Sequence, residues 1–373
     1  MALILDLRAA IREFVHDGEI VALEGFTHLI PSAAGHESVG APSPSPGEGT
    51  TSYQPIRGCA MKTLTENGLT AAALARLAKA PNPRMKEIMT SLIRHMHGFV
   101  RETGLTPAEW KTGIEFLTAV GHITDDKRQE FILLSDTLGV SAMVDLVRHR
   151  RLGHGTDSSL LGPFYRNGAP EQPLGASIAG DTPGETLVLR GQVTDAHGRP
   201  LADALLDVWQ AGPNGKYDIQ EEHLTGMNLR GRFRTGADGR YEFRSVKPKS
   251  YPVPDDGPVG VLLRAQGRHP YRPAHIHFIV TAEGYEPLIT ALYIAGDSYI
   301  ESDAVFGAKQ SLTVGYHKSR AANGKSERAP DAIEFDFTLS AAAGQPSSRR
   351  PRSVRPARPA APSRQSRRRR HAV

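Results

Sequence analysis

Two histidines separated by one residue, His275 and His277, are the residues of this sequence best placed for metal chemistry. Residues 276–280 around them are rich in β-branched and apolar side chains, which predicts a β-strand. Side chains alternate between the two faces of a strand, so residues i and i+2 point the same way with Cα atoms about 7 Å apart. Two imidazoles on one face can bind one metal ion. The alternative is a pair of solvent-facing histidines on a half-buried strand.

Three further residues favour the metal interpretation. Arg272 lies just before His275, Tyr251 lies in Lys247-Pro248-Lys249-Ser250-Tyr251-Pro252, and Tyr165 ends Leu161-Gly162-Pro163-Phe164-Tyr165. The order G-P-x-Y, P-x-x-Y, R-P-A-H-x-H-F resembles the pattern of the intradiol ring-cleavage dioxygenases, and the resemblance covers residues 62–338. These are non-haem Fe(III) enzymes that cleave aromatic 1,2-diols between the two hydroxyl-bearing carbons. The resemblance therefore implies an enzyme whose substrates are an aromatic diol and O2.

The resemblance also implies a ligand set, namely Tyr165, Tyr251, His275 and His277. In it, Tyr251 leaves the metal and acts as a base, and Tyr165 stays bound. Tyrosine is a rare ligand because its reference pKa is near 10, so a hard, highly charged ion must hold it ionised. This favours Fe(III) over zinc and over the Fe(II) site of two histidines and one carboxylate. Arg272 would lie beside the iron and stabilise the electron-rich diolate.

The segment from Leu288 to Gly307 resembles the hydroxyquinol-cleaving branch of this family. Catechol enzymes usually carry Gln where Ala291 stands, and Phe-Ala where Ala304 and Val305 stand. The smaller Ala304 would leave room for a third hydroxyl at the ring edge. With Arg272, these three residues are the expected substrate contacts, and 1,2,4-trihydroxybenzene is the expected substrate, opened to 3-hydroxy-cis,cis-muconate or its tautomer maleylacetate. The alternative is catechol or chlorocatechol 1,2-dioxygenase activity, which gives cis,cis-muconates.

Residues 61–160 are expected to form a helical region in front of the metal strand. Asn82-Pro83 is a helix start signal, and Thr106 to Glu109 is a capping box with proline at the first helical position. A third helix is predicted from about Asp125 to Arg148. The resemblance implies that these helices form a homodimer interface, in some members with a phospholipid between the subunits.

Residues 161–340 are expected to form an antiparallel β-sandwich that carries the metal site, so that the fold class is α+β. Asp238-Gly239 predicts a hairpin between Arg232–Arg234 and Tyr241–Phe243. The other predicted strands are Thr186–Val193, Leu205–Trp209, Ala274–Val280, Leu288–Ile294 and Ile333–Leu339. The segments around Gly191 and Val208 also resemble transthyretin-type sandwiches, so a binding module without catalysis is a second alternative.

The two ends of the chain differ from this central part in composition. Ile11 to Pro31 resembles the opening of a CoA-transferase subunit, and residues 39–58 have the Gly, Pro, Ser and Thr content of a linker. We expect residues 1–60 to have no function of their own, because so short a fragment cannot bury a core; a functional N-terminal module is the alternative. Residues 341–373 are expected to be disordered, since they consist mainly of Arg, Pro, Ser and Ala.

The net charge of +5 arises from the ten arginines after Ser348, so it does not make the central part basic. Nucleic acid is therefore not an expected partner, apart from nonspecific binding or membrane-surface attachment by this tail. Cys59 is the only cysteine, which excludes disulfides within the chain and disfavours cysteine metal sites. No apolar run is long enough to span a membrane, and acidic residues interrupt any N-terminal signal pattern. A cytoplasmic location is expected.

Overall fold

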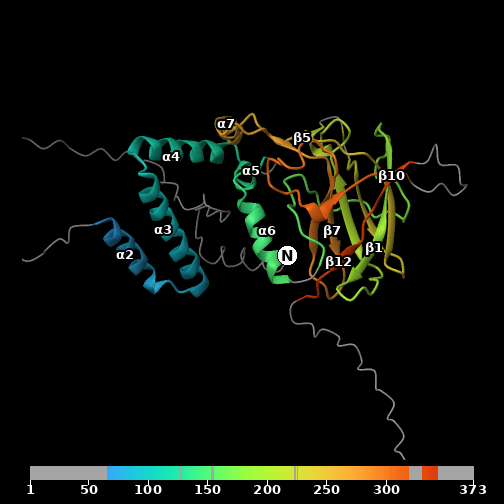
Figure 1. The fold of residues 1–373 in the computed structure, drawn as a ribbon, viewed down its shortest axis with the longest axis horizontal. Coiled ribbons are helices and arrows are strands. Elements are labelled where there is room, and N and C mark those ends of the chain that lie inside the picture. Colours follow the sequence, from blue (N-terminus) through green and yellow to red (C-terminus); the bar gives the residue numbers. More distant parts are fainter. Residues whose placement is uncertain are drawn as a thin grey trace, which may run out of the picture.

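A helical part and a β-sandwich follow one another along the chain in the computed structural model (Figure 1). The structure describes residues 65–125, 128–152, 155–221, 224, 226–318 and 330–342. The α+β class is confirmed. The CoA-transferase-like fragment and linker (1–60) lie outside the described residues, as does the Arg/Pro-rich tail beyond residue 342.

The first helices are α2 (Glu66–Arg76), the 3-10 turn η2 (Leu77–Lys79), α3 (Pro83–Thr103) and α4 (Pro107–His122). Both predicted start signals are confirmed. The side chain of Asn82 accepts a hydrogen bond from the Met85 N–H before α3, and Thr106 and Glu109 form the capping box of α4. None of the helices in the described part of the chain is long and apolar enough to cross a membrane.

The predicted helix from Asp125 to Arg148 is two helices, α5 (Glu130–Thr137) and α6 (Val140–Leu152). The chain breaks at Gly139, whose φ of +74° is left-handed and cannot continue a right-handed helix. A further helix, α7 (Pro258–Ala265), packs against α4 and α5. In Figure 1, α5 and α6 lie between the outer helices α2 to α4 and the sheets.

Two five-stranded sheets form the sandwich. In the first, β1 pairs with β4, β11 and β12, and β10 pairs with β11; in the second the order is β3-β2-β7-β8-β9. A separate ribbon pairs β5 with β6. The first sheet contains β1 (Thr186–Asp195), β4 (Arg240–Val246), β10 (His317–Lys318), β11 (Asp331–Glu334) and β12 (Phe337–Leu339). The second contains β2 (Leu205–Gln210), β3 (Arg230–Arg234), β7 (His275–Thr281), β8 (Leu288–Ile294) and β9 (Thr313–Val314). The ribbon and the short 3-10 turns are β5 (Tyr251–Pro252), β6 (Tyr271–Arg272), η3 (Asp218–Gln220) and η4 (Gln310–Leu312).

The predicted antiparallel sandwich is confirmed in most of its strand pairs, but the prediction missed the parallel pairs that both sheets contain. β1 is parallel to β11 and to β12, and β8 is parallel to β9. The single strand predicted from Ile333 to Leu339 is accordingly two short strands along β1. The break faces Gly191, where a Cβ atom would lie 1.8 Å from the Phe335 carbonyl oxygen, so only glycine permits this close approach.

The predicted hairpin at Asp238-Gly239 is also wrong. β3 pairs with β2 and β4 pairs with β1, so this turn carries the chain from one sheet to the other. Both strands bury an aromatic ring between the sheets, and the rings of Phe233 and Phe243 stack with centroids 4.9 Å apart. Burial of these two rings in one core explains why the strands face each other across the sandwich instead of pairing edge to edge.

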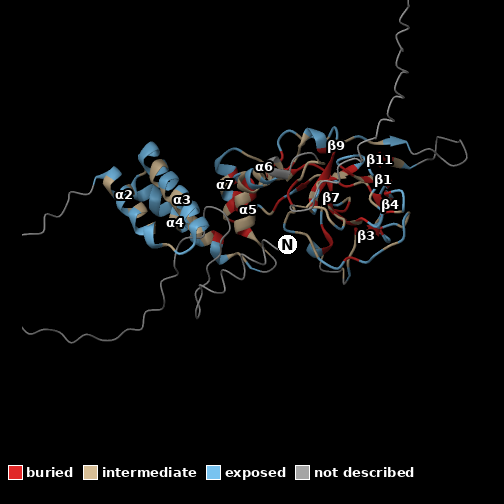
Figure 2. Ribbon diagram, turned by 90° about the horizontal axis from the view of Figure 1, so that it is seen from below, coloured by how far each residue is buried: buried red, intermediate tan, exposed pale blue. Residues whose placement is uncertain are grey.

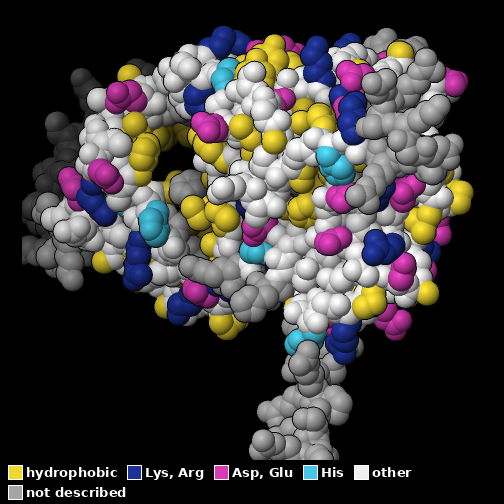
Figure 3. Space-filling model, turned by 45° about the vertical axis from the view of Figure 1, so that its right-hand side comes forward, with side chains coloured by type: hydrophobic (Ala, Val, Ile, Leu, Met, Phe, Trp, Pro, Cys, Tyr) yellow, Lys and Arg dark blue, Asp and Glu magenta, His cyan; other side chains and the backbone are white. Residues whose placement is uncertain are grey.

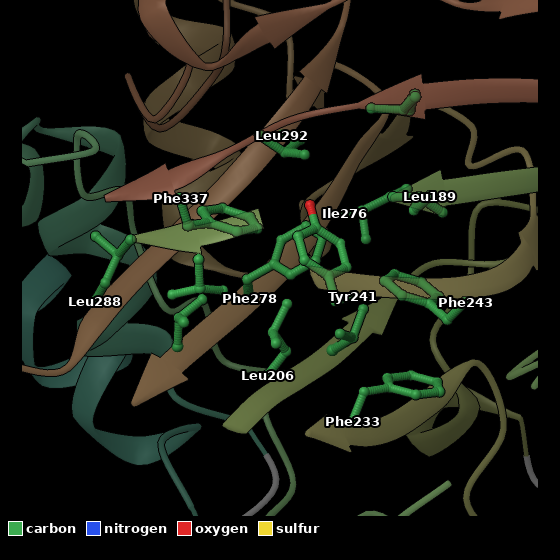
Figure 4. Close-up of a cluster of buried hydrophobic side chains, with 14 of the residues drawn as sticks. Leu189, Leu206, Phe233, Tyr241, Phe243, Ile276, Phe278, Leu288, Leu292 and Phe337 are labelled. Atoms are coloured by element: carbon green, nitrogen blue, oxygen red, sulfur yellow. The ribbon is translucent and has the colours of Figure 1, made fainter. Parts of the chain in front are cut away.

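The strand β7 divides its side chains between the core and the outer face of its sheet. Ile276, Phe278 and Val280 are fully buried in the intersheet cluster, which Figure 4 shows with Leu206, Phe243 and Phe337 among its members. His275 and His277 alternate with these residues and point to the opposite face. The core therefore fixes the direction of both imidazoles.

We expect Phe278→Ala to lower the free energy of unfolding by about 3–5 kcal/mol, because it removes a fully buried ring from between the sheets. Guanidinium denaturation would measure the change. As a control, Leu174→Ala, at a side chain that is 44% exposed, should change stability by less than about 0.5 kcal/mol. Equal effects of the two substitutions would contradict the assignment of Phe278 to the core.

Candidate metal centre

The imidazoles of His275 and His277 converge on the outer face of β7, with their Nε2 atoms 3.0 Å apart. The Nδ1–H of His275 donates to the Pro273 carbonyl at 2.7 Å, which leaves a lone pair on its Nε2. The ring of His277 stacks on the indole of Trp209 from the neighbouring strand β2, with centroids 4.8 Å apart. The Pro273 carbonyl and the Trp209 indole thus hold the two rings in place and leave both Nε2 atoms directed at one point.

Tyr251 lies beside these histidines because the ribbon β5–β6 leads directly into β7. In this ribbon Tyr251 pairs with Arg272, and the chain then passes through Pro273 and Ala274 to His275. The Tyr251 hydroxyl lies 3.2 Å from the hydroxyl of a second tyrosine, Tyr217, which in turn lies 3.5 Å from Nε2 of His275. Two imidazole nitrogens and two phenol oxygens therefore meet at one buried point.

The structure contradicts the expectation that Tyr165 is one of the four ligands. Its hydroxyl donates to Asp207 Oδ2 at 3.0 Å, and its ring contacts Trp209. Asp207 stands two residues before Trp209 on β2, about 7 Å further along the strand. The G-P-x-Y segment does border the site, but through Gly162, where a Cβ atom would lie 3.7 Å from the His277 ring.

Tyr217 reaches the site because the chain turns back immediately after β2. Gly215, with φ of +78°, forms this turn and packs so close that a Cβ atom would lie 3.2 Å from the Tyr251 Cβ. The next residue after Tyr217, Asp218, accepts hydrogen bonds from the buried guanidinium of Arg230 and from Arg166. This ion pair fixes the turn, and with it the direction of the Tyr217 ring.

Burial shifts the pKa of each of these four groups toward its neutral form. It lowers the pKa of His275 to about 3 and that of His277 well below its ordinary value, with the charge of Arg272 acting in the same direction. It also raises the pKa of Tyr251, and that of Tyr217 well above its ordinary value. The histidines are therefore neutral at physiological pH and the tyrosines keep their protons.

This arrangement fits a metal ion by its donor atoms and their spacing. Atoms that share an ion at about 2.1 Å lie about 3 to 3.5 Å from one another, which is the range of the separations given above. No group of three His, Cys, Asp or Glu side chains suited to a metal occurs in the described part of the chain, so this centre depends on its phenol oxygens. Two phenols that hold their protons tightly require a highly charged ion to ionise them.

Arg272 is buried next to the four groups. Its Nη1 donates to His275 Nε2 at 3.1 Å, and its Nε donates to Asp303 Oδ1 at 3.2 Å. Burial raises the pKa of Asp303, but the guanidinium more than offsets this and holds it below its ordinary value. The centre therefore contains a fixed positive charge whose counter-ion lies away from the four donor atoms.

Ala291, Ala304 and Val305 are all buried, and they lie on two segments, β8 and the loop after Asp303. Ala291 pairs with His277 across β7 and β8, so its methyl group lies on the same face as the imidazole. Ala304 and Val305 directly follow Asp303, and Val305 belongs to the same buried cluster as Val253, two residues after Tyr251. The expected substrate contacts thus lie within the elements that build the site.

The sequence motifs did not identify Tyr217, Asp303 or Tyr293 as residues of the site. The signal for Tyr217 was the turn Pro213-Asn214-Gly215 immediately after the apolar strand that contains Trp209, because such a turn returns the chain over the same sheet. For Asp303 and Tyr293 the local sequence holds no such signal. Their roles depend on contacts with Arg272, which is distant in the chain from both.

Two family models match this chain, one described as "Catechol dioxygenase N terminus" over residues 82–154 and one described as "Dioxygenase" over residues 160–341. Both begin after residue 60, so the CoA-transferase resemblance stays a prediction. A 6-chlorohydroxyquinol 1,2-dioxygenase of Cupriavidus pinatubonensis is 48% identical over 280 residues, which are 75% of this chain and 99% of that protein. A hydroxyquinol 1,2-dioxygenase of a Rhizobium species is 48% identical over 292 residues, with the same two shares.

The fold is similar to a solved structure of hydroxyquinol 1,2-dioxygenase from Pseudomonas putida DLL-E4. The TM-score is 0.70 and the identity 44%, over 74% of this chain and 99% of that one. The similarity extends over both the helical part and the sandwich. Family models, relatives of full length and fold agree: the chain belongs to the intradiol ring-cleavage dioxygenases.

Proposed function

We propose that this protein is a non-haem Fe(III) enzyme that cleaves 1,2,4-trihydroxybenzene with O2 to 3-hydroxy-cis,cis-muconate, the tautomer of maleylacetate. Both atoms of O2 enter the product, so the reaction needs no reductant. The observation that carries the proposal is the meeting of two imidazole nitrogens and two phenol oxygens beside a buried arginine. The names of the relatives support the choice of the triol.

The residues that would hold the iron are Tyr217, Tyr251, His275 and His277. Bound Fe(III) would supply a Lewis acid that withdraws electron density from the diol and makes its ring reactive toward O2. Tyr251 Oη is proposed to take a proton from the diol, as the family resemblance implies, while Tyr217 stays a ligand. The position of Tyr251 supports this role, because it lies on a strand of two residues beside Arg272.

Arg272 is proposed to stabilise the negative charge that the diol carries once it has lost its protons. Arg272 as a whole is only 3% exposed, so little water screens its charge. A cation that is already fixed in place stabilises developing charge without reorganisation. Because Asp303 lies on the far side of the guanidinium from His275, the positive charge remains available at the site.

The third hydroxyl of the triol is proposed to lie near Ala291, Ala304 and Val305. Ala291 and Ala304 are smaller than the Gln and Phe that catechol enzymes usually carry at these positions, which supports a substrate larger than catechol. A site built to bind a hydroxyl rejects an analogue without it more strongly than an apolar pocket rejects a smaller ligand. Catechol and chlorocatechols are the competing substrates.

A homodimer through α3 and α4, with a phospholipid between the subunits, is part of the proposal, as is a cytoplasmic location. The support for the dimer is that α3 has an apolar side but buries none of its residues within one chain. Figure 2 shows α2, α3 and α4 largely exposed, and Figure 3 shows hydrophobic side chains beside the hollow that separates the outer helices from the rest of the molecule. Phe99 and Trp110 are 55% and 59% exposed.

Substitutions of the four proposed ligands should separate iron binding from turnover. Tyr217→Phe, His275→Ala and His277→Ala should each lose most of the iron and the visible absorption of an iron–tyrosinate site. Tyr251→Phe should keep the iron but lower kcat by about 10²- to 10⁴-fold, because the base is removed. Metal analysis, visible spectra and oxygen uptake would measure these effects.

The matched control is Tyr165→Phe, which removes a hydroxyl that donates to Asp207 and should leave iron content and absorption unchanged. Loss of iron in this variant, with retention in Tyr217→Phe, would restore Tyr165 as the ligand. A colourless wild-type protein that takes up no iron would favour the non-catalytic binding module.

The substrate assignment is tested by comparing kcat/KM for 1,2,4-trihydroxybenzene, catechol and 4-chlorocatechol. We expect the triol to be preferred over catechol by about 10- to 100-fold, since the additional hydroxyl would fill the room proposed beside Ala304. Formation of the ring-opened acid would be followed by its absorbance and mass. A preference for catechol or the chlorocatechol would refute the substrate but not the reaction class.

The proposed boundaries are tested with a chain that runs from Met61 to Ala342. It should form a dimer in solution, bind iron and keep full activity, because the described helices, the sandwich and all four proposed ligands lie within it. Light scattering and oxygen uptake would check both properties. A monomer, or an unfolded chain, would show that residues outside these limits are required.

A further inference from the structure

The guanidinium of Arg272 has two chemically distinct sides in this structure. Its Nε donates to Asp303 Oδ1 at 3.2 Å, and its Nη2 donates to Asp303 Oδ2 at 3.3 Å and to the hydroxyl of Tyr293 at 3.1 Å. Only Nη1 is directed to the four donor atoms, where it meets His275 Nε2. Arginine is planar, so fixing the Nε–Nη2 edge also fixes the direction of Nη1.

Asp303 is itself held rigidly by the backbone that follows it. Its Oδ1 accepts from the Val305 N–H at 3.3 Å, and its Oδ2 accepts from the N–H groups of Gly307 and Ala308 at 3.0 and 3.1 Å. One buried carboxylate therefore joins Arg272 to the whole loop 303–308. That loop also carries Ala304 and Val305, the residues proposed to face the substrate.

Tyr293 also contacts the Arg272 guanidinium and is linked to loop 303–308. It stands on β8 two residues after Ala291, on the same face of the sheet, and its ring contacts that of His275. Its hydroxyl lies 2.8 Å from Ser159 Oγ, and Ser159 donates to the Gly307 carbonyl at 3.0 Å. The tyrosine hydroxyl is thus part of a hydrogen-bonded chain that ends on the same loop.

The space around the guanidinium is filled. A Cβ atom on Gly307 would lie 2.7 Å from Arg272 Nη2 and 2.7 Å from the Tyr293 hydroxyl. The Nη2 side therefore has no room for a substrate atom, whereas Nη1 faces the donor atoms and is hydrogen-bonded to an imidazole nitrogen that an ion would engage.

We propose that Asp303 and Tyr293 are positioning residues for Arg272: together they engage Nε and Nη2, and so present Nη1 to the bound diol. The inference rests on the proposed function, because the diol is the ligand that Nη1 would meet. The contacts with Asp303 and Tyr293 explain why the guanidinium of Arg272 points toward the donor atoms. Loop 303–308 then determines both the orientation of this charge and, through Ala304 and Val305, the shape of the site.

The test is a set of double-mutant cycles in the iron-loaded enzyme. Asp303→Asn, Tyr293→Phe and Gly307→Ala are made alone and in combination with Arg272→Lys, which cannot engage Asp303 by two nitrogens. Asp303→Asn and Gly307→Ala should each lower kcat for the triol about 10-fold or more, and Tyr293→Phe about 3-fold or more, with iron content unchanged. In the Arg272→Lys background each should cost less than about 2-fold, because coupled residues lose their effect together.

Binding of 4-nitrocatechol without O2, followed by its visible absorbance, provides a second readout that needs no turnover. Its Kd should rise in the three single variants and show the same coupling to Arg272→Lys. Arg272→Gln serves as an alternative background if the lysine variant does not fold. The inference would be overturned if the three substitutions lowered kcat and raised Kd by the same factors in the Arg272→Lys or Arg272→Gln background as in the wild type.

Asp195→Asn is the matched control for loss of a buried carboxylate. Asp195 accepts from Arg199 Nε at 2.6 Å and from the N–H groups of His197 and Arg199, but lies at the end of β1. It should lower the melting temperature and leave kcat and Kd unchanged; a loss of kcat equal to that of Asp303→Asn would also overturn the inference. If the wild-type enzyme does not cleave the triol, the proposed function fails, and the 4-nitrocatechol cycles still decide the roles of Asp303 and Tyr293.

Discussion

The strict alternation of side chains along β7 is the constraint on which the metal centre depends. Ile276, Phe278 and Val280 are fully buried between the two sheets, and this burial fixes the register of β7 against β2 and β8. A shift of one residue would place the imidazoles in the apolar core and three large apolar side chains on the other face, at a cost of several kcal/mol. The same contacts that stabilise the sandwich therefore aim His275 and His277 at one point, and the neighbouring strands bring Trp209 and Ala291 beside them.

Burial of the site removes charged side chains from water, which costs free energy, and each of these charges is paired with a counter-ion. Arg272 and Asp303 form a buried ion pair, as do Arg230 and Asp218 behind Tyr217. Breaking such a pair by removing one partner costs about 3–5 kcal/mol, since a charge is left without a counter-ion in a medium of low dielectric constant. Each pair fixes one segment that borders the site. Asp218 fixes the turn that carries Tyr217, and Asp303 fixes the loop beside Arg272. Removal of water also keeps the histidines neutral, which is the form that binds metals.

The error over Tyr165 shows where a motif stops being informative. Its segment does cover the site, since Gly162 packs against His277, but the chain then carries the tyrosine past Trp209 to Asp207. Tyr217 lies in a stretch that sequence analysis interpreted only as part of a sandwich. Tyr165 and Tyr217 both precede Tyr251 in the chain, so their order does not distinguish them. The turn after β2 brings the Tyr217 hydroxyl to His275, whereas the Tyr165 hydroxyl lies about 7 Å further along β2.

The sequence by itself determined the helix starts at Asn82 and Thr106, the common face of His275 and His277, and the proximity of Tyr251 to Arg272, because each of these depends on local hydrogen bonds or on the two-residue period of a strand. It also determined the family through three motifs in order. Only the tertiary structure decided that Tyr217 completes the donor set, that β3 and β4 belong to different sheets, and that Asp303 and Tyr293 engage Arg272. These contacts join residues far apart in the chain, and their formation depends on which apolar surfaces are buried together, a balance over the whole fold that no local pattern contains.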